Sequence, residues 1–254
     1  MKLALMSDIH ANSHALEACL AHASAAGANK IALLGDLVGY GGSPAKVVQR
    51  VMALAEQGAI VLQGNHDALA VAPPSKVTHR GDEGAQWTHE QLNPEQRQFL
   101  AQLPLTHLAQ TVLLVHASVD APAQWRYVDN ERAASASLDA AVAPPYGHPD
   151  VRHVFGGHVH HQTLYYRGAG RNLMPFAPTP GVPVPTPRHR SWIATVGSVG
   201  QPRDGRTGAM YAMFDTTAMQ LTFYRVEYDH NAAAACIRAA GMPEHFAQRL
   251  EGGR

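Results

Sequence analysis

Five short apolar runs in this chain each end close to side chains that can bind a metal ion. Short, nearly continuous apolar runs are typical of buried strands, and open α/β sheets bind their ligands at the carboxyl ends of such strands. The runs are Leu3–Met6, Ile31–Leu34, Ala59–Leu62, Thr111–Val115 and Val151–Phe155. They are followed by Asp8-Ile9-His10, Gly35-Asp36, Gly64-Asn65-His66-Asp67, His116, and Gly156-Gly157-His158-Val159-His160. The sequence therefore predicts one rim crowded with His, Asp and Asn, which is a metal site.

The first part of the chain alternates predicted strands with predicted helices. We expect helices from about Ser13 to Ala26 and from about Pro44 to Gln57, the second with Ser43 as N-cap and Pro44 at its first position. Such alternation is typical of βαβ units and a parallel sheet. Strand Thr111–Val115 is expected to resume this sheet.

Three further stretches are predicted to be helical. Residues 73–104 read as a helical excursion in which Asn93-Pro94-Glu95-Gln96 has the composition of a helix start. A second helix is expected over Glu131–Ala141, and a third from about Asn231 to Leu250.

After Val151 the pattern changes to closely spaced strands. A second, more antiparallel sheet, packed on the first, is expected from Thr163–Arg167, Trp192–Val196, Ala209–Phe214 and Gln220–Val226. Residues 173–188 carry six prolines and are predicted to form a long loop. A loop of this length either walls a site or serves as a solvated spacer. We find no internal repeat and expect residues 1–254 to form a single domain.

Composition limits the classes of function. Lys+Arg and Asp+Glu both number 20, so a broad electrostatic grip on nucleic acid is not expected. The two cysteines, Cys19 and Cys236, are too few for a disulfide framework and are expected to be reduced. No apolar run approaches the roughly 18 residues of a membrane span. We therefore expect a soluble, cytoplasmic protein without a membrane partner; its oligomeric state is left open.

Two of the strand-end motifs are predicted to present ligands in the same way. In extended backbone, residues i and i+2 face one side, so Asp8-Ile9-His10 and His158-Val159-His160 would each aim two ligands at one point. The apolar residue between them would turn into the core. Gly156 and Gly157 would allow the tight exit that the second pair needs.

The donor types indicate which cations the site would hold. Asp36 has two carboxylate oxygens and can bridge two cations, and Asn65 offers an amide oxygen. Four histidines against two carboxylates favour Mn, Fe, Ni, Zn or Co over Mg or Ca. Two divalent cations would outweigh the charge of Asp8 and Asp36, so we expect an anionic substrate, with phosphate the first choice.

Taken together, these motifs resemble the signature of the calcineurin-like metallophosphoesterases. The resemblance covers residues 1 to about 215 and is closest to small bacterial and archaeal phosphodiesterases. The string Gly35-Asp36-Leu37-Val38-Gly39-Tyr40-Gly41 and the string from Gly197 to Gly205 also match them. The second string is expected on a turn close to the metals. The resemblance implies an α/β (α+β) fold, a four-layer αββα sandwich of two packed mixed β-sheets flanked by helices, with a dinuclear site at the carboxyl ends of strands.

The resemblance also assigns roles to single residues. It implies that one cation is held by Asp8, His10, Asp36 and His160, and the other by Asp36, Asn65, His116 and His158. Both would be divalent transition metals, with Mn the first choice. His66 would be the catalytic proton donor. We expect substrate contacts from Asn65, Tyr40, Arg203 and Asn12, with capping of the first helix as the alternative for Asn12. Asp67 is expected to orient the local backbone or His66.

This chain departs from the protein phosphatases of the superfamily at two positions. They carry Asp and Arg where this chain has Gly39 and Tyr40. That Asp orients the proton-donating histidine, and that Arg clamps the phosphate of a monoester dianion. Their loss favours a diester monoanion, with Arg203 or Arg126 supplying charge from another loop. On the loop that carries Arg126, an aromatic side chain could stack on a base or aryl group, or simply pack under the loop.

We therefore expect a phosphodiesterase that acts on a small phosphoester or nucleotide. Displacement would be in line, with a hydroxide between the two cations as nucleophile and His66 protonating the departing oxygen. The alternatives are a phosphomonoesterase or protein phosphatase and, in a different class, a metal-bound binding module without catalysis. A comparison of diester with monoester turnover separates all three.

Overall fold

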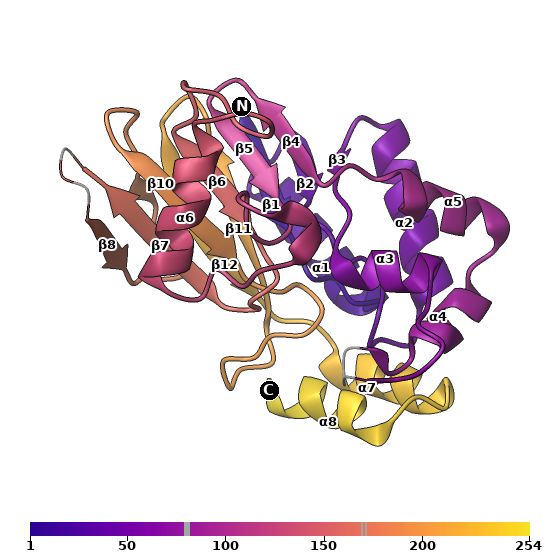
Figure 1. Ribbon diagram of the computed structural model, residues 1–254. Coiled ribbons are helices and arrows are strands. Elements are labelled where there is room, and N and C mark those ends of the chain that lie inside the picture. The colour runs from indigo at the N-terminus through magenta and orange to yellow at the C-terminus, as the bar shows by residue number, and fades with distance from the viewer. Residues whose placement is uncertain (79–81, 169, 171) are drawn as a thin grey trace.

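The structure is a computed structural model that describes residues 1–78, 82–168, 170 and 172–254 (Figure 1). Within these residues, strands form two mixed six-stranded sheets. The first sheet contains β1 (Lys2–Met6), β2 (Lys30–Leu33), β3 (Ile60–Val61), β9 (Val184–Pro185), β11 (Ala209–Asp215) and β12 (Gln220–Val226), in the order β3-β2-β1-β11-β12-β9. The second contains β4 (Thr106–Ala109), β5 (Val112–Val115), β6 (His153–Gly156), β7 (Gln162–Arg167), β8 (Leu173–Phe176) and β10 (Ser191–Val196), in the order β4-β5-β6-β10-β7-β8.

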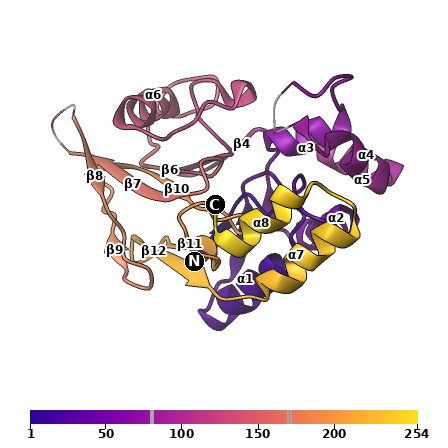
Figure 2. The ribbon, with the colours of Figure 1, turned by 90° about the horizontal axis from the view of Figure 1, so that it is seen from below.

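Helices cover the outer faces of both sheets. In Figure 2, α6 lies over the second sheet, and α1 lies beyond the opposite face of the first. The α-helices of the described residues are α1 (Ser13–Ala25), α2 (Pro44–Glu56), α3 (Asn65–Val71), α4 (Ala85–Gln91), α5 (Pro94–Gln102), α6 (Glu131–Ala141), α7 (His230–Ala239) and α8 (Glu244–Gly252). This confirms the predicted αββα sandwich. None of these helices is long and apolar enough to cross a membrane.

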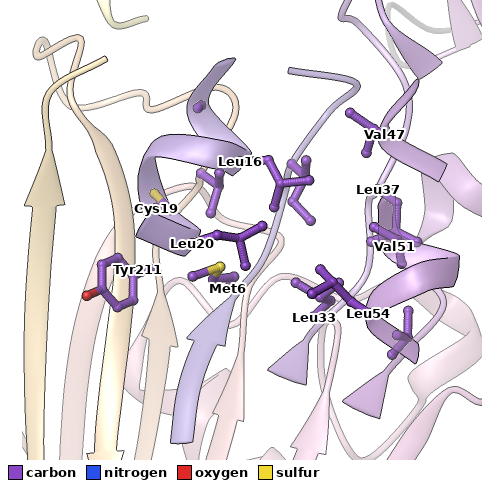
Figure 3. Packing of buried hydrophobic residues seen from close by; sticks show 14 of the residues in the cluster. Met6, Leu16, Cys19, Leu20, Leu33, Leu37, Val47, Val51, Leu54 and Tyr211 are labelled. Atoms are coloured by element: carbon purple, nitrogen blue, oxygen red, sulfur yellow. The ribbon is translucent and has the colours of Figure 1, made fainter. Parts of the chain in front are cut away.

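Side-chain alternation along the strands creates the layers. In β1, Leu3 and Leu5 join the apolar core between the sheets, whereas Ala4 and Met6 face α1 and α2. Figure 3 shows the outer core, where Met6 packs among side chains of both helices. Burying each large aliphatic side chain contributes about 1.5–3 kcal/mol, so the sheet is anchored on both faces.

Helix starts follow the predicted chemistry with one exception. Asn93 and Gln96 form a reciprocal capping box at α5, and Pro44 stands at the first position of α2. Ser43 is the N-cap residue of α2, but its side chain makes no capping hydrogen bond within the described part of the chain. The rigid φ of Pro44 therefore begins this helix without help from the serine.

The predicted division of strands between the sheets was wrong. β11 pairs antiparallel with β1, so β11 and β12 belong to the first sheet. β5 and β6 belong to the second sheet, where β6 pairs in parallel with β10. An apolar run shows that a strand is buried, but it does not show which neighbour forms its hydrogen bonds. The predicted rim is therefore built jointly by the two sheets, from the carboxyl ends of strands in each.

The proline-rich stretch is not a single long loop. Residues 173–176 form β8 and residues 184–185 form β9, each an edge strand of a different sheet. Proline lacks the N–H of a ladder bond, and an edge strand tolerates that loss. Pro175 and Pro185 therefore fit where a central strand would have excluded them.

Two helical predictions also need correction. The excursion over residues 73–104 contains α4 and α5, but residues 79–81 lie outside the described residues. The tail forms two helices, α7 and α8, because Gly241 adopts a positive φ of 68° and Pro243 follows it. β4 was not predicted; it pairs antiparallel with β5 at the edge of the second sheet.

Candidate metal centre

The predicted ligands converge from the carboxyl ends of five strands in two sheets. Asp8, Asp36 and Asn65 follow β1, β2 and β3 of the first sheet, whereas His116 and His158 follow β5 and β6 of the second. Ligand atoms lie within 4.8 Å of one another in each of three groups, which are Asp8–His10–His160, Asp36–His116–His158 and His10–Asp36–His66. The first two groups each contain three residues of one of the two expected ligand sets.

Backbone carbonyls fix the tautomers of three ligand histidines. Nδ1 of His10, His116 and His160 lies 3.1, 2.8 and 2.6 Å, respectively, from a carbonyl oxygen. A carbonyl oxygen only accepts hydrogen bonds, so each Nδ1 carries a proton, and in the neutral form of each ring Nε2 exposes a lone pair. The three carbonyls belong to Val38, Leu34 and Gln201.

These lone pairs face one another at distances that call for a cation. His10 Nε2 lies 3.0 Å from His160 Nε2, and His116 Nε2 lies 3.2 Å from His158 Nδ1. The first pair consists of two nitrogens without protons, which repel unless a positive charge lies beside them. The two contacts therefore mark two separate points at which imidazole nitrogens would hold a metal ion.

Each carboxylate uses one oxygen for the fold and offers the other to the site. Asp8 Oδ2 accepts a hydrogen bond from the His158 N–H, and Asp36 Oδ1 accepts one from the His66 N–H, both at 2.9 Å. Asp36 Oδ2 lies 3.8 Å from His10 Nε2 and 3.4 Å from His116 Nε2. This oxygen stands between the two groups of ligands, which is the position of a bridging ligand.

Two oxygens of the expected ligands are buried and lack a hydrogen-bond partner among the described residues. They are Asp8 Oδ1 and Asn65 Oδ1. An unpaired buried oxygen costs about 1–3 kcal/mol, and more when it is charged. Both oxygens belong to the predicted ligand sets, and oxygen and imidazole donors together suit a divalent transition metal. The residues present therefore fit a divalent transition metal.

The electrostatics of the rim also favour a cation. Burial opposes a charge on His116, but the carboxylates of Asp36 and Asp8 and the Leu34 carbonyl together outweigh burial and raise the pKa of His116 to about 9. A bound cation would take the place of the second proton on this ring. Burial and the nearby His116 lower the pKa of His158 to about 4, which keeps its imidazole neutral. Asp36 thus attracts positive charge into the second group while His158 leaves a lone pair for it.

The backbone of the rim is strained in a way that the sequence did not reveal. Asp8 and His10 have φ of 55° and 48°, and His158 and His160 have φ of 69° and 57°. The prediction of extended backbone for both pairs was therefore wrong. Asp8 and His10 do meet in one group of ligand atoms, whereas His158 and His160 belong to two different groups. Left-handed conformations cost about 1–3 kcal/mol in such residues and persist where the surroundings impose them. Their gathering at this rim indicates a site selected for function.

Close backbone approach explains the glycine before each of two ligands. A Cβ atom at Gly157 would overlap Ser7 Oγ and Asp8 Oδ2, and one at Gly64 would overlap the backbone and carboxylate of Asp36. The first contact joins the end of β6 to the end of β1, across the two sheets. Gly157 is thus required for the junction at which the sheets share their ligands.

The turn after β10 lies beside this junction, as predicted from its sequence. Ser198 Oγ donates to the Asp8 carbonyl at 2.8 Å, and the Gly200 N–H donates to the same oxygen at 2.9 Å. The carbonyl of Gln201 holds His160, as described above. The role of Gln201 was missed because any residue supplies a carbonyl; only its place in the string from Gly197 pointed to this turn.

The side of the rim that carries the expected proton donor His66 also holds Tyr40 and Arg203. The rings of Tyr40 and His66 lie 4.3 Å apart between centroids, and Tyr40 is 8% exposed. The Arg203 guanidinium lies 5.8 Å from the centre of the Tyr40 ring and donates to Gln201 Oε1. Asp67 accepts hydrogen bonds from the N–H groups of Leu37, Val38 and Gly64, which confirms that it orients the local backbone.

Asn12 serves the fold. Its Oδ1 accepts from the Ala15 N–H at 3.1 Å and so caps α1, as the alternative interpretation predicted. Its Nδ2 donates to the Gly200 carbonyl and to the Tyr228 hydroxyl. With both ends of the amide committed, Asn12 ties α1 to the turn after β10.

The loop after β5 places an aromatic ring at the open side of the centre. Tyr127 is 53% exposed and stacks on His158, with ring centroids 4.2 Å apart and an interplanar angle of 26°. Trp125 lies edge-on to His116 at 5.8 Å. The Arg126 side chain is 57% exposed and pairs with Asp120 at 2.9 Å, so its charge is already neutralised at the surface.

Comparison with known proteins agrees with the family resemblance of the sequence motifs. The family model of the calcineurin-like phosphoesterase superfamily domain matches residues 1–219. An uncharacterized protein of Methanocaldococcus jannaschii is 30% identical over 259 residues, which span 99% of this chain and 98% of that protein.

Two crystal structures share the fold over the full chain. A metallophosphoesterase from Sphaerobacter thermophilus is 36% identical, covers 100% of both chains and superposes with a TM-score of 0.85. A hypothetical protein from Pyrococcus horikoshii OT3 is 18% identical, covers 100% of this chain and 98% of its own, and has a TM-score of 0.78. The second likeness concerns the fold alone.

Proposed function

The chain belongs to the calcineurin-like phosphoesterase superfamily, and from that premise we propose that it is a two-metal phosphodiesterase of small phosphodiesters or nucleotides. One observation carries the proposal most directly. Lone pairs of buried imidazoles meet at two points, and a single oxygen of Asp36 stands between them. Two bound divalent cations would supply positive charge to the phosphoryl oxygens and lower the pKa of water there.

The ligand sets are part of this proposal. We assign Asp8, His10, Asp36 and His160 to one cation, and Asp36, Asn65, His116 and His158 to the other. Mn is the proposed metal because the donors mix imidazole nitrogen with carboxylate and amide oxygen.

His66 is the proposed proton donor to the departing oxygen. Its ring is buried, and burial lowers the pKa of His66, while the carboxylate of Asp36 acts in the opposite direction and favours the protonated ring that donation needs. One of its nitrogens lies within 4.8 Å of ligand atoms of His10 and Asp36, close to where a scissile bond would lie. From this position the imidazole could contact a bound substrate and donate a proton to its departing oxygen.

Preference for a diester is supported by the position of Tyr40. The side chain that replaces the phosphate-clamping arginine of the protein phosphatases is uncharged and buried against His66. Arg203, half-buried beside Tyr40, offers a single positive group, whereas Arg126 is paired with Asp120. One such cation suits the single negative charge of a diester better than the dianion of a monoester.

Tyr127 supports the proposal that the substrate carries an aryl or nucleoside group. One face of its ring lies on His158, and more than half of the side chain is exposed. A base or aryl ring that stacks on such a platform gains about 1–3 kcal/mol. Tyr127 is therefore the proposed stacking partner of the substrate.

The remaining expectations concern the whole chain. We propose that residues 1–254 act as a single domain, which is supported by the pairing of β11 with β1 and by the packing of Phe246 on Tyr40. We also propose a cytoplasmic location, supported by the unpaired thiols Cys19 and Cys236.

The test is a pair of rates on metal-free protein reloaded with Mn(II), Ni(II), Co(II), Zn(II) or Mg(II). Bis(p-nitrophenyl) phosphate and p-nitrophenyl phosphate are compared, with bound metal counted in each sample. We expect the diester to turn over well above the monoester when two transition-metal ions are bound. Faster monoester turnover would instead make the protein a phosphomonoesterase. Two bound metals without turnover of either ester would make it a binding module.

A further inference from the structure

His66 lacks the carboxylate that orients the equivalent histidine in protein phosphatases, and a glycine stands in its place. A Cβ atom at Gly39 would lie 2.7 Å from His66 Nδ1, so the bare backbone of Gly39 covers this edge of the ring. Gly39 has a φ of 89°, which favours glycine for a second, independent reason. With the Nδ1 edge covered, Nε2 is the nitrogen that faces the ligands.

The ring of His66 is enclosed by other rings. Tyr40 lies 4.3 Å from it at an interplanar angle of 57°, and His10 lies 5.1 Å away at 85°. Tyr40 also contacts His10, with centroids 4.8 Å apart. Tyr40 thus fills the space between the proposed donor and a proposed metal ligand. Its ring limits the rotation of His66, whereas His10 is held separately by the hydrogen bond from its Nδ1 to the Val38 carbonyl.

Tyr40 is itself held by the C-terminal helices. Phe246 of α8 packs against Tyr40, with ring centroids 5.1 Å apart. Both side chains belong to an apolar cluster that α7 and α8 form with Tyr40. A Cβ atom at Gly42 would come within 2.5 Å of the Cys236 carbonyl, so the loop after Tyr40 rests directly on α7. This close fit explains how Tyr40 keeps a left-handed φ of 60°.

We infer that Tyr40 is a positioning residue that holds the His66 imidazole for proton donation, with Phe246 of α8 as its support. The inference rests on the proposed phosphodiesterase function. Packing replaces the missing hydrogen bond: Gly39 admits the ring, Tyr40 restricts its rotation, and the helix pair α7–α8 keeps Tyr40 in place. An imidazole displaced by about 1 Å loses on the order of a hundredfold in rate, so this support matters for catalysis.

The test compares good and poor leaving groups in Tyr40→Leu, Tyr40→Phe and wild-type protein. We expect Tyr40→Leu to lower kcat about tenfold or more on diphenyl phosphate but far less on bis(p-nitrophenyl) phosphate, because only the poorer leaving group needs its proton. KM and bound metal should not change. Tyr40→Phe keeps the ring and should restore kcat. Phe246→Leu, which leaves Tyr40 in place, should give a smaller loss of the same kind.

A double-mutant cycle shows whether Tyr40 acts through His66. In a His66→Ala background, Tyr40→Leu should have no further effect on kcat. An additive loss, an equal loss on both esters, or a fall in bound metal would overturn the inference, since each would place the effect of Tyr40 elsewhere.

A spectroscopic readout separates this inference from the proposed function. In zinc-loaded protein labelled with ¹⁵N-histidine, the ring signals of His66 should shift and broaden in Tyr40→Leu and return in Tyr40→Phe. Unchanged signals would refute the positioning role even in an active enzyme. A shift in a protein that hydrolyses neither ester would support the positioning role while the proposed function fails.

Discussion

The two sides of the rim are held by different forces. On the metal side, backbone carbonyls and N–H groups orient most of the proposed ligands, as in the hydrogen bond between His116 Nδ1 and the Leu34 carbonyl. On the donor side, His66 is enclosed by Gly39 and the ring of Tyr40, which Phe246 supports. Hydrogen bonds orient a side chain through particular atoms, whereas packing fixes the space that a ring can occupy. Substitutions on the two sides should therefore have different consequences.

The largest loss of activity is expected from substitution of Asp36, the proposed ligand of both cations. Asp36→Asn keeps the shape but removes the charge that faces both ligand groups. Loss of several kcal/mol of charge stabilisation should lower kcat/KM by about 10⁴-fold. Bound metal should fall at the same time, as measured by elemental analysis. Asp150→Asn, at a side chain that is 71% exposed, is the matched control and should change neither quantity. Full metal binding in Asp36→Asn would contradict the bridging assignment.

The next effect should appear on the donor side without loss of metal. His66→Ala removes the proposed general acid, which contributes about 10²–10³-fold to kcat for a poor leaving group. The measurement is kcat on a series of aryl esters together with metal content. If good and poor leaving groups suffer equally, His66 is not the proton donor. A fall in metal content would instead assign His66 to the ligands.

Two glycines allow the sides to be compared with one kind of substitution. Gly157→Ala forces a methyl group against Ser7 and Asp8, so bound metal should fall and kcat should drop about tenfold to a hundredfold. Gly39→Ala pushes on His66 Nδ1, so metal should stay bound while kcat on poor leaving groups drops about tenfold. Thermal unfolding of both variants controls for general damage. The same loss of metal in both would remove the distinction between the two sides.

A smaller effect is expected from the proposed phosphate contact. Arg203→Ala removes one charge-assisted interaction, which corresponds to about ten- to thirtyfold in kcat/KM for a diester. Arg126→Ala is the matched control, since its guanidinium pairs with Asp120, and it should leave kcat/KM unchanged. The opposite ranking would move the phosphate contact to the loop after β5.

The smallest effect should concern selectivity. Tyr127→Ala removes the exposed ring on His158 and should lower kcat/KM about fivefold for aryl or nucleoside esters relative to alkyl esters. Tyr146→Ala, at another partly exposed tyrosine, should leave the ratio as it is. An unchanged ratio in Tyr127→Ala would assign Tyr127 to packing over His158.

Much of the metal side could be predicted because its information is local. Each ligand follows its own apolar run, so Asp8, Asp36 and His116 are visible without knowledge of strand order. The donor side is different. Phe246 lies more than 200 residues beyond Tyr40 along the chain, on a helix whose apolar residues indicate only that one face is buried. A buried helix face does not show which segment packs against it, so the packing of Phe246 on Tyr40 could not be predicted.

The sequence by itself determined most of the strands, most helix limits and the set of side chains that meet at the rim. These depend on periodicity, capping chemistry and the chain direction of strands, which act over a few residues. Only the tertiary structure decided that two sheets share the rim, that the ligand pairs adopt left-handed backbone, and that α7 and α8 close the donor side. The physical reason is that strand partners and packing contacts are chosen among distant segments of similar hydrophobicity, and the whole fold must form before one choice has the lowest free energy.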